Sequence, residues 1–280
     1  MEVHVHQDSS RPVALVTGGT SGIGRSIAAS LIAEGATVHI LGSNAEKGAA
    51  AQRALGGSSH FIQLDLSDLR AVRDFARRFA AGVHRLDTLV HVAGVVLQER
   101  QETVDGYEKT LTIDHLAAYL LSRELRTLMA RAPHPRILNV SAPASQVLNA
   151  EIRFDDLHLK EGYSFTRATV QGLHAKTVMT QVLAERFAAE GIDVNAFDPG
   201  AVRSDLSSNL RFPLRQVMRF AQLFMPTVSK TGVYASTAAE LNGVTGQFIN
   251  GRERTPLQFD LAYTQRVADV TESLIERALT

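Results

Sequence analysis

Short apolar or β-branched runs alternate with longer amphipathic stretches from one end of the chain to the other. Seven short runs predict β-strands at residues 13–17, 37–41, 60–64, 88–92, 136–140, 193–197 and 247–249. The stretches between them predict helices near residues 23–34, 45–54, 69–79, 104–129, 168–190 and 231–241. Strands that alternate with helices form parallel sheets with crossover connections. The pattern therefore predicts an α/β fold with one doubly wound parallel sheet, flanked by helices on both faces.

No linker, repeat or low-complexity segment interrupts this alternation. A chain of 280 residues with 45% hydrophobic content can bury one large core. We expect a polar N-terminal tail at residues 1–10 and a single domain at residues 11–280. The irregular region at residues 204–229 carries many apolar side chains and follows a predicted strand, where open α/β sheets bind ligands. It is predicted to form a substrate loop.

The composition excludes several classes of function. With 29 basic and 29 acidic side chains the formal net charge is zero, so the sequence predicts no nucleic-acid partner. The chain has no cysteine, which excludes disulfides and thiolate metal sites, and no metal site is expected. It has no apolar run of about 18 residues and no signal-peptide pattern at its start. We therefore expect a soluble, cytoplasmic protein without a membrane span.

A glycine-rich turn joins the first predicted strand to the first predicted helix. The segment TGGTSGIG, residues 17–24, has glycines that permit a tight turn and let a pyrophosphate approach the free N–H groups of the helix. This context favours a dinucleotide site of the Rossmann type over a plain structural turn. The expected contacts there are Gly18, Thr20, Ser21, Gly22, Ile23 and Gly24.

The same segment resembles the TGxxxGIG fingerprint of the short-chain dehydrogenase/reductase family, and the likeness covers nearly the whole chain. Further matches are the segments LDL at 64–66, HVAG at 91–94 and DPG at 198–200. The resemblance implies further cofactor contacts at Asp65, Leu66, Ala93, Gly94, Pro199, Gly200 and Ser204. The segments IRFDDL at 152–157 and NGVTGQFINGRERTPL at 242–257 resemble the retinol-dehydrogenase-like branch in particular. That branch implies a lipophilic small molecule as substrate or ligand.

The choice of cofactor is weakly specified. At the end of the second strand an acid would bind the ribose of NAD, and an arginine would suit the phosphate of NADP. The chain has Leu41-Gly42-Ser43-Asn44 there, with neither. Ser43 takes the place of that arginine, and Ser21 the place where some relatives carry a second base. The absence of an acid favours NADP slightly over NAD, and loss of dinucleotide binding stays open.

The catalytic positions that the resemblance implies are all substituted. Conventional members use asparagine, serine, tyrosine and lysine, and the lysine lowers the pKa of the tyrosine that passes a proton to or from the substrate oxygen. An ungapped alignment of residues 163–187 puts Thr169 at the tyrosine and Leu173 at the lysine; Ala142 falls at the serine and Asp114 at the asparagine. A threonine hydroxyl is far less acidic than a phenol, and leucine cannot relay a proton. Conventional alcohol or carbonyl chemistry is predicted to be absent or strongly reduced.

Asp114 is the candidate for a replacement catalytic group. A carboxylate in a partly buried helix can have a raised pKa and act as an acid or base. The alternative is a structural side chain that bonds a neighbouring backbone group, as the family's asparagine also does.

Three hypotheses on function follow. The first is an enzyme with an unconventional active site, and the second is a catalytically inactive sensor or partner protein. The third is a residual NADP(H)-dependent oxidoreductase that acts on an activated alcohol or carbonyl substrate. The resemblance also implies a possible homodimer through the fourth and fifth helices.

Overall fold

One central sheet organises the structure, a computed structural model that describes residues 11–203, 216 and 225–280. Its eight strands lie in the order β3-β2-β1-β4-β5-β6-β7-β8. The strands are β1 (Val13–Thr17), β2 (Thr37–Gly42), β3 (Ser59–Gln63), β4 (Thr88–His91), β5 (Arg136–Val140), β6 (Asp193–Phe197), β7 (Gln247–Asn250) and β8 (Glu253–Pro256). All neighbouring strands are parallel except β7 and β8. This arrangement confirms the predicted doubly wound α/β fold.

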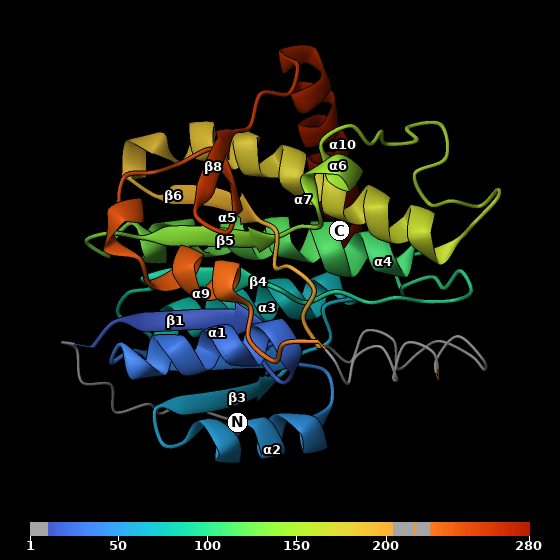
Figure 1. Cartoon of the computed structure of the whole chain (residues 1–280). Coiled ribbons are helices and arrows are strands. Elements are labelled where there is room, and N and C mark those ends of the chain that lie inside the picture. Colours follow the sequence, from blue (N-terminus) through green and yellow to red (C-terminus); the bar gives the residue numbers. More distant parts are fainter. Residues whose placement is uncertain (1–10, 204–215, 217–224) are drawn as a thin grey trace.

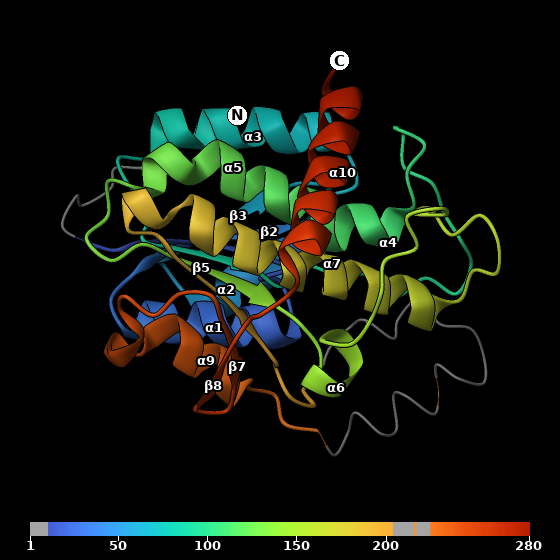
Figure 2. The same ribbon diagram turned by 90° about the horizontal axis from the view of Figure 1, so that it is seen from above.

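Helices cover both faces of the sheet (Figures 1 and 2). One face carries α1 (Gly22–Ala33), α2 (Ala45–Leu55) and α9 (Lys230–Thr237). The other carries α3 (Leu69–Gly82), α5 (Ala117–Met129) and α7 (Phe165–Arg186). Strands β1, β4, β5 and β6 are buried along their whole length, because helices cover them from both sides. The apolar core accordingly divides into two large clusters, one on each side of the sheet.

The C-terminal segment forms a long helix, α10 (Leu261–Leu279), that the sequence pattern did not predict. It runs across the outer surface of the α3, α5 and α7 layer (Figure 2). Its buried positions include Val267, Thr271, Leu274 and Ala278, which recur at the spacing of one helix face. Asp260 caps its first turn by accepting a hydrogen bond from the Tyr263 N–H. These are ordinary helix signals, so the prediction was wrong to leave this helix out.

The predicted helix at 104–129 begins later and is not uniform. It starts with the short α4 (Lys109–Leu111), where the buried Glu108 carboxylate accepts hydrogen bonds from the Thr110 and Leu111 N–H groups. A π-helical turn, η1 (Thr112–Leu116), then leads into α5. The short helix α6 (Ala144–Val147) and strand β8 were also not predicted. The short helices η2 (Ala188–Glu190) and η4 (Ala239–Leu241) form the ends of the predicted helices at 168–190 and 231–241. The predicted substrate loop at 204–229 lies largely outside the described residues.

Close packing fixes the turn between β1 and α1. A Cβ atom on Gly24 would lie 2.4 Å from the carbonyl oxygen of Gly18, and a Cβ atom on Gly18 would lie 2.9 Å from the backbone of Ala93. The Thr17 hydroxyl accepts hydrogen bonds from the Val92 and Ala93 N–H groups, each at 3.1 Å. The first glycine turn is therefore pressed against the end of β4, and helix α1 against the turn itself.

We expect Gly24→Ala to destabilise the fold, because its methyl group would push against backbone that cannot rotate away. The expected cost is about 1–3 kcal/mol in the free energy of unfolding, measured by urea titration. Gly57→Ala is the matched control, since a Cβ atom there would meet nothing within 4 Å. Equal stability of the two variants would contradict the proposed close packing.

Candidate functional site

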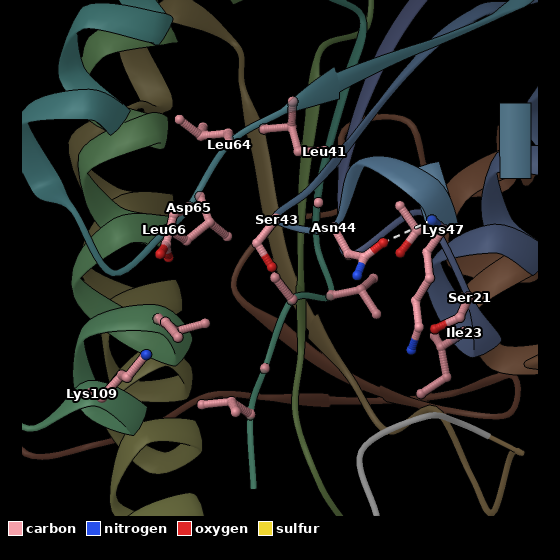
Figure 3. Close-up of a pocket in the computed structure, with 18 of the residues that line it drawn as sticks. Ser21, Ile23, Leu41, Ser43, Asn44, Lys47, Leu64, Asp65, Leu66 and Lys109 are labelled. Carbon is pink, nitrogen blue, oxygen red and sulfur yellow. Dashed lines mark hydrogen bonds between the residues drawn. The ribbon is translucent and has the colours of Figure 1, made fainter. Parts of the chain in front are cut away.

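A cleft opens at the carboxyl ends of β1, β2 and β4 (Figure 3). In the sheet, β1 lies between β2 and β4, so the chain continues to one side of β1 first and to its other side later. Open α/β sheets bind ligands at the carboxyl ends of the strands where the strand order reverses in this way. The cleft has a volume of about 490 Å³. Its walls are Gly18, Thr20, Ser21, Ile23, Leu41, Gly42, Ser43, Asn44, Lys47, Leu64, Asp65, Leu66, Val92, Ala93, Gly94, Val95, Leu97, Gln101, Lys109 and Ile113.

Most of the predicted cofactor contacts meet at this cleft. Its walls include Gly18, Thr20, Ser21, Ile23, Ser43, Asp65, Leu66, Ala93 and Gly94. Gly22 and Gly24 lie in the first turn of α1 beside them. Pro199 and Gly200 follow β6 and do not line the cleft, and Ser204 lies outside the described residues.

The N-terminus of α1 is suited to an anion. Its N-cap residue, Ser21, makes no side-chain hydrogen bond to the first turn. By contrast, the side chains of Asn44, Asp68, Ser164, Ser229 and Asp260 cap α2, α3, α7, α9 and α10. Free N–H groups and the helix dipole favour negative charge at such an end. Together with the absence of side chains at Gly18 and Gly24, this geometry fits the pyrophosphate of a dinucleotide.

Two cationic side chains of the cleft were missed by the sequence prediction. Lys47 comes from the first turn of α2, and Lys109 from α4 on the opposite wall. The cleft's carboxylate, Asp65, accepts hydrogen bonds from the Ser67 N–H and hydroxyl at 2.9 and 2.8 Å. Lys47 could have been noticed, because it lies in the first turn of the helix that follows the second predicted strand. Lys109 could not, because it was assigned to the interior of a long helix.

The four positions aligned with the conventional catalytic set gather around α7. Leu173 packs in an apolar cluster with Ala142, Ala144 and Leu148. The Thr169 hydroxyl is buried and has no hydrogen-bond partner among the described residues. The Ser141 hydroxyl, next to Ala142, bonds the Thr177 hydroxyl at 2.8 Å and so points into the core.

No tyrosine hydroxyl is hydrogen-bonded to a lysine, and all five tyrosines of the chain lie within the described residues. Tyr107 donates to the Leu274 carbonyl, Tyr163 to the Leu97 carbonyl, and Tyr119 to Glu272. The Tyr263 hydroxyl bonds His174 Nε2 at 2.7 Å. Tyr234 lies on α9, on the other face of the sheet from α7, beneath the guanidinium of Arg252.

Asp114 is buried in the π-helical turn and faces α7. Its Oδ1 atom accepts a hydrogen bond from the Val95 N–H at 3.3 Å, which is the structural role that an asparagine would also fill. A Cβ atom on Gly172 would lie 3.1 Å from the Asp114 Cβ, so the missing side chain of Gly172 makes room for it. Burial raises the pKa of Asp114 to about 7; Lys176 opposes this rise and Glu108 adds to it.

Lys176 lies on the same face of α7 as Gly172, one helical turn further along. Its side chain is buried, and its amine has no hydrogen-bond partner in the described part of the chain. Burial lowers the pKa of Lys176 to about 8, and Asp114 acts in the opposite direction. The amine also helps to lower the pKa of His91 and of His115, although burial is the main cause for both. A buried cation, a carboxyl group and two neutral imidazoles thus gather behind the cleft.

The C-terminal helix covers part of this layer. Glu272 of α10 forms ion pairs with Arg123 of α5 at 3.0 Å and with Arg186 of α7 at 3.2 Å. The His115 Nε2 atom and the Thr271 hydroxyl are 2.8 Å apart. None of the helices in the described ranges combines the length and apolar character needed to cross a membrane.

The fold and the glycine turn beside the cleft define a Rossmann-type protein. The sequence matches the short chain dehydrogenase family over residues 12–213. The chain therefore belongs to the short-chain dehydrogenase/reductase family.

Its relatives lie in the retinol-dehydrogenase-like branch. It is 35% identical to polyprenol dehydrogenase from Mus musculus over 261 residues, 88% of this chain and 77% of that protein. It is 28% identical to retinol dehydrogenase 14 from Homo sapiens over 289 residues, 93% of this chain and 85% of that protein.

Solved structures share the fold. A chain from Mycobacterium Paratuberculosis, described as an uncharacterized protein, superposes with a TM-score of 0.70 at 27% identity, over 95% of this chain and 94% of that one. A protein from Beutenbergia cavernae, described as an NAD(P) dependent gluconate 5-dehydrogenase with bound NADP, has a TM-score of 0.63 at 25% identity. That comparison covers 86% of this chain and 94% of the other.

The buried amine of Lys176 leads to a prediction on stability. Its lowered pKa means that the stability linked to this group is present above pH 10.5, its ordinary value, and is lost as the pH falls through about 8. We expect Lys176→Met to raise the melting temperature at pH 6, where Asp114 is protonated in both proteins, by at least about 3 °C. The gain should shrink toward pH 10.

Calorimetry at both pH values checks this expectation. Lys230→Met, on the surface of α9, is the matched control and should change little at either pH. A lower melting temperature of Lys176→Met at pH 6 would mean that the buried amine has a favourable partner, contrary to the geometry described above.

Proposed function

We propose that this chain binds a nicotinamide dinucleotide in the cleft and acts on a lipophilic small molecule through an unconventional active site. The observation that carries the proposal is the apolar packing of Leu173 and Ala142 against one buried cluster, at the two positions where relatives are expected to carry a lysine and a serine. A bound dinucleotide would supply hydride transfer. Any proton would have to come from a group around α7 other than the tyrosine and lysine that conventional members use.

The nucleotide part of the proposal is supported by the glycine turn and the uncapped start of α1. Gly18 and Ser21 would lie beside the pyrophosphate, and Asp65 and Leu66 beside the adenine. The lipophilic ligand is inferred from relatives named for polyprenol and retinol. Pro199, Gly200 and Ser204 remain proposed contacts of the nicotinamide end.

Asp114 is the proposed proton-exchanging group of this site. It is the buried carboxyl group between the cleft backbone at Gly94 and the α7 residues Gly172 and Lys176. Its raised pKa keeps part of the population protonated at neutral pH, which suits an acid or base. Its Oδ1 atom bonds the Val95 N–H, and Gly94 and Val95 both line the cleft.

The proposed homodimer would have to include α10. The helices expected to form it correspond to α4 to α5 and to α7, and the ion pairs of Glu272 hold α10 against both. We therefore propose that a dimer interface on this face would include α10 together with α5 and α7.

Restoring the conventional residues tests the proposal. We expect the wild-type protein to reduce simple aldehydes with NADPH at least about 100-fold more slowly than a variant with Asp114→Asn, Ala142→Ser, Thr169→Tyr and Leu173→Lys. The matched control carries Phe instead of Tyr at position 169, which keeps the ring and removes the hydroxyl. Melting temperatures and NADPH binding establish that each variant is folded. Brisk turnover by the wild type, unchanged by these substitutions, would contradict the proposal.

A second test concerns Asp114 alone. Once a turnover is found, Asp114→Asn should lower it by at least about 100-fold, because the amide fits the space of the carboxyl group but exchanges no proton. The wild-type rate should show an inflection near pH 7 that the variant lacks. If Asp114 acts as an acid, the rate falls as the pH rises through about 7; if it acts as a base, the rate rises. A full rate in the variant would remove Asp114 from the mechanism.

A further inference from the structure

A buried positive charge lies behind the cleft without a bond of its own. Lys176 is 2% exposed, and its amine has no hydrogen-bond partner among the described residues. Helix α7 is fixed to β5 directly after this lysine. The Thr177 hydroxyl bonds the Ser141 hydroxyl at 2.8 Å, and the Thr180 hydroxyl accepts a hydrogen bond from the Asn139 amide at 3.0 Å. The packing of α7 on β5 therefore holds the amine in the core.

Two histidines near this amine are neutral. Ser122 and Thr271 each donate their hydroxyl proton to a carbonyl of their own helix. Each hydroxyl therefore accepts a hydrogen bond from an imidazole N–H, that of His91 Nε2 at 2.9 Å and that of His115 Nε2 at 2.8 Å. Burial, and to a lesser extent the Lys176 amine, lowers the pKa of both histidines to about 3. Neither imidazole adds a positive charge beside the amine at neutral pH.

Asp114 connects this buried group to the backbone of the cleft. Its Oδ1 atom accepts a hydrogen bond from the Val95 N–H, and Gly94 and Val95 line the cleft. Two charged side chains act on it from neighbouring elements, Lys176 from α7 and Glu108 from the start of α4. Burial and Glu108 raise the pKa of Asp114, and Lys176 opposes this rise. Without the amine, the carboxyl group would stay protonated to higher pH.

We propose that Lys176 is a positioning residue for proton exchange at Asp114: its positive charge keeps the carboxyl group able to take up a proton as well as to release one. This inference rests on the proposed role of Asp114. The amine acts through the electric field and not through a bond, since it makes no hydrogen bond to the described residues. Such a field is stronger in the protein interior than in water, because the interior is less polarisable. The buried amine thus has a task that its lack of partners does not prevent.

The protonation of Asp114 can be measured in the full chain without any turnover. Carboxyl-carbon NMR with ¹³C-labelled aspartate reports it, and Asp114→Asn identifies its signal. We expect a midpoint near pH 7 in the wild type, and one that lies at least about one pH unit higher in Lys176→Met. Lys176→Gln removes the same charge but keeps a polar group, so it should raise the midpoint as well. Lys230→Met, on the surface of α9, is the matched control and should leave the midpoint unchanged.

These titrations separate the two possible failures. If Asp114 does not titrate near pH 7 in the wild type, its proposed role is wrong and that of Lys176 is wrong with it. If the wild-type midpoint lies near pH 7 and stays there in folded Lys176→Met and Lys176→Gln, the role of Asp114 stands and only that of Lys176 is overturned. A higher midpoint in both variants supports the proposal. Once a turnover is found, the inflection of its rate should move to higher pH by the same amount.

Discussion

The contact between α7 and the π-helical turn determines how the catalytic region is built. Gly172 has no side chain, and a Cβ atom there would lie only 3.1 Å from the Cβ atom of Asp114. This close approach fixes the position of α7 along the turn, so that Leu173 packs against an apolar cluster and Lys176 extends into the core. A π-helical turn widens a helix locally, and such turns are frequent at functional sites. The chemistry available behind the cleft therefore depends on one glycine and one carboxyl group.

The buried charges carry a cost that a purely structural role does not explain. An amine and a carboxyl group that lose their hydration are stabilised only by good mutual geometry or by further hydrogen bonds. Lys176 lacks such bonds to the described residues. The pKa of Asp114 is raised and that of Lys176 is lowered, so each shift favours the neutral form of its group. A pair of this kind can exchange a proton near neutral pH. This property connects the packing of α7 to the unconventional active site that we propose.

The cleft and the region around α7 follow different physical rules. At the glycine turn, backbone approaches backbone, and no side chain could replace Gly24 without displacing Gly18. Such steric requirements preserve a nucleotide-type site in a recognisable form. Around α7, by contrast, side chains decide the chemistry, and the apolar Leu173 and Ala142 fit the same fold as a lysine and a serine would. The same scaffold can thus keep its glycine turn while the side chains around α7 change.

The sequence by itself determined the order of strands and helices, the glycine turn and the carboxyl-end cleft, because period, turn residues and strand direction are local properties. The prediction missed α10 and the late start of the helix at Lys109, although the local caps Asp260 and Glu108 mark where these helices begin. Only the tertiary structure brought Lys109 to the cleft, on the wall opposite Lys47. Likewise, only packing placed Lys176 behind Asp114, since burial and the resulting pKa shifts arise from elements far apart in the chain.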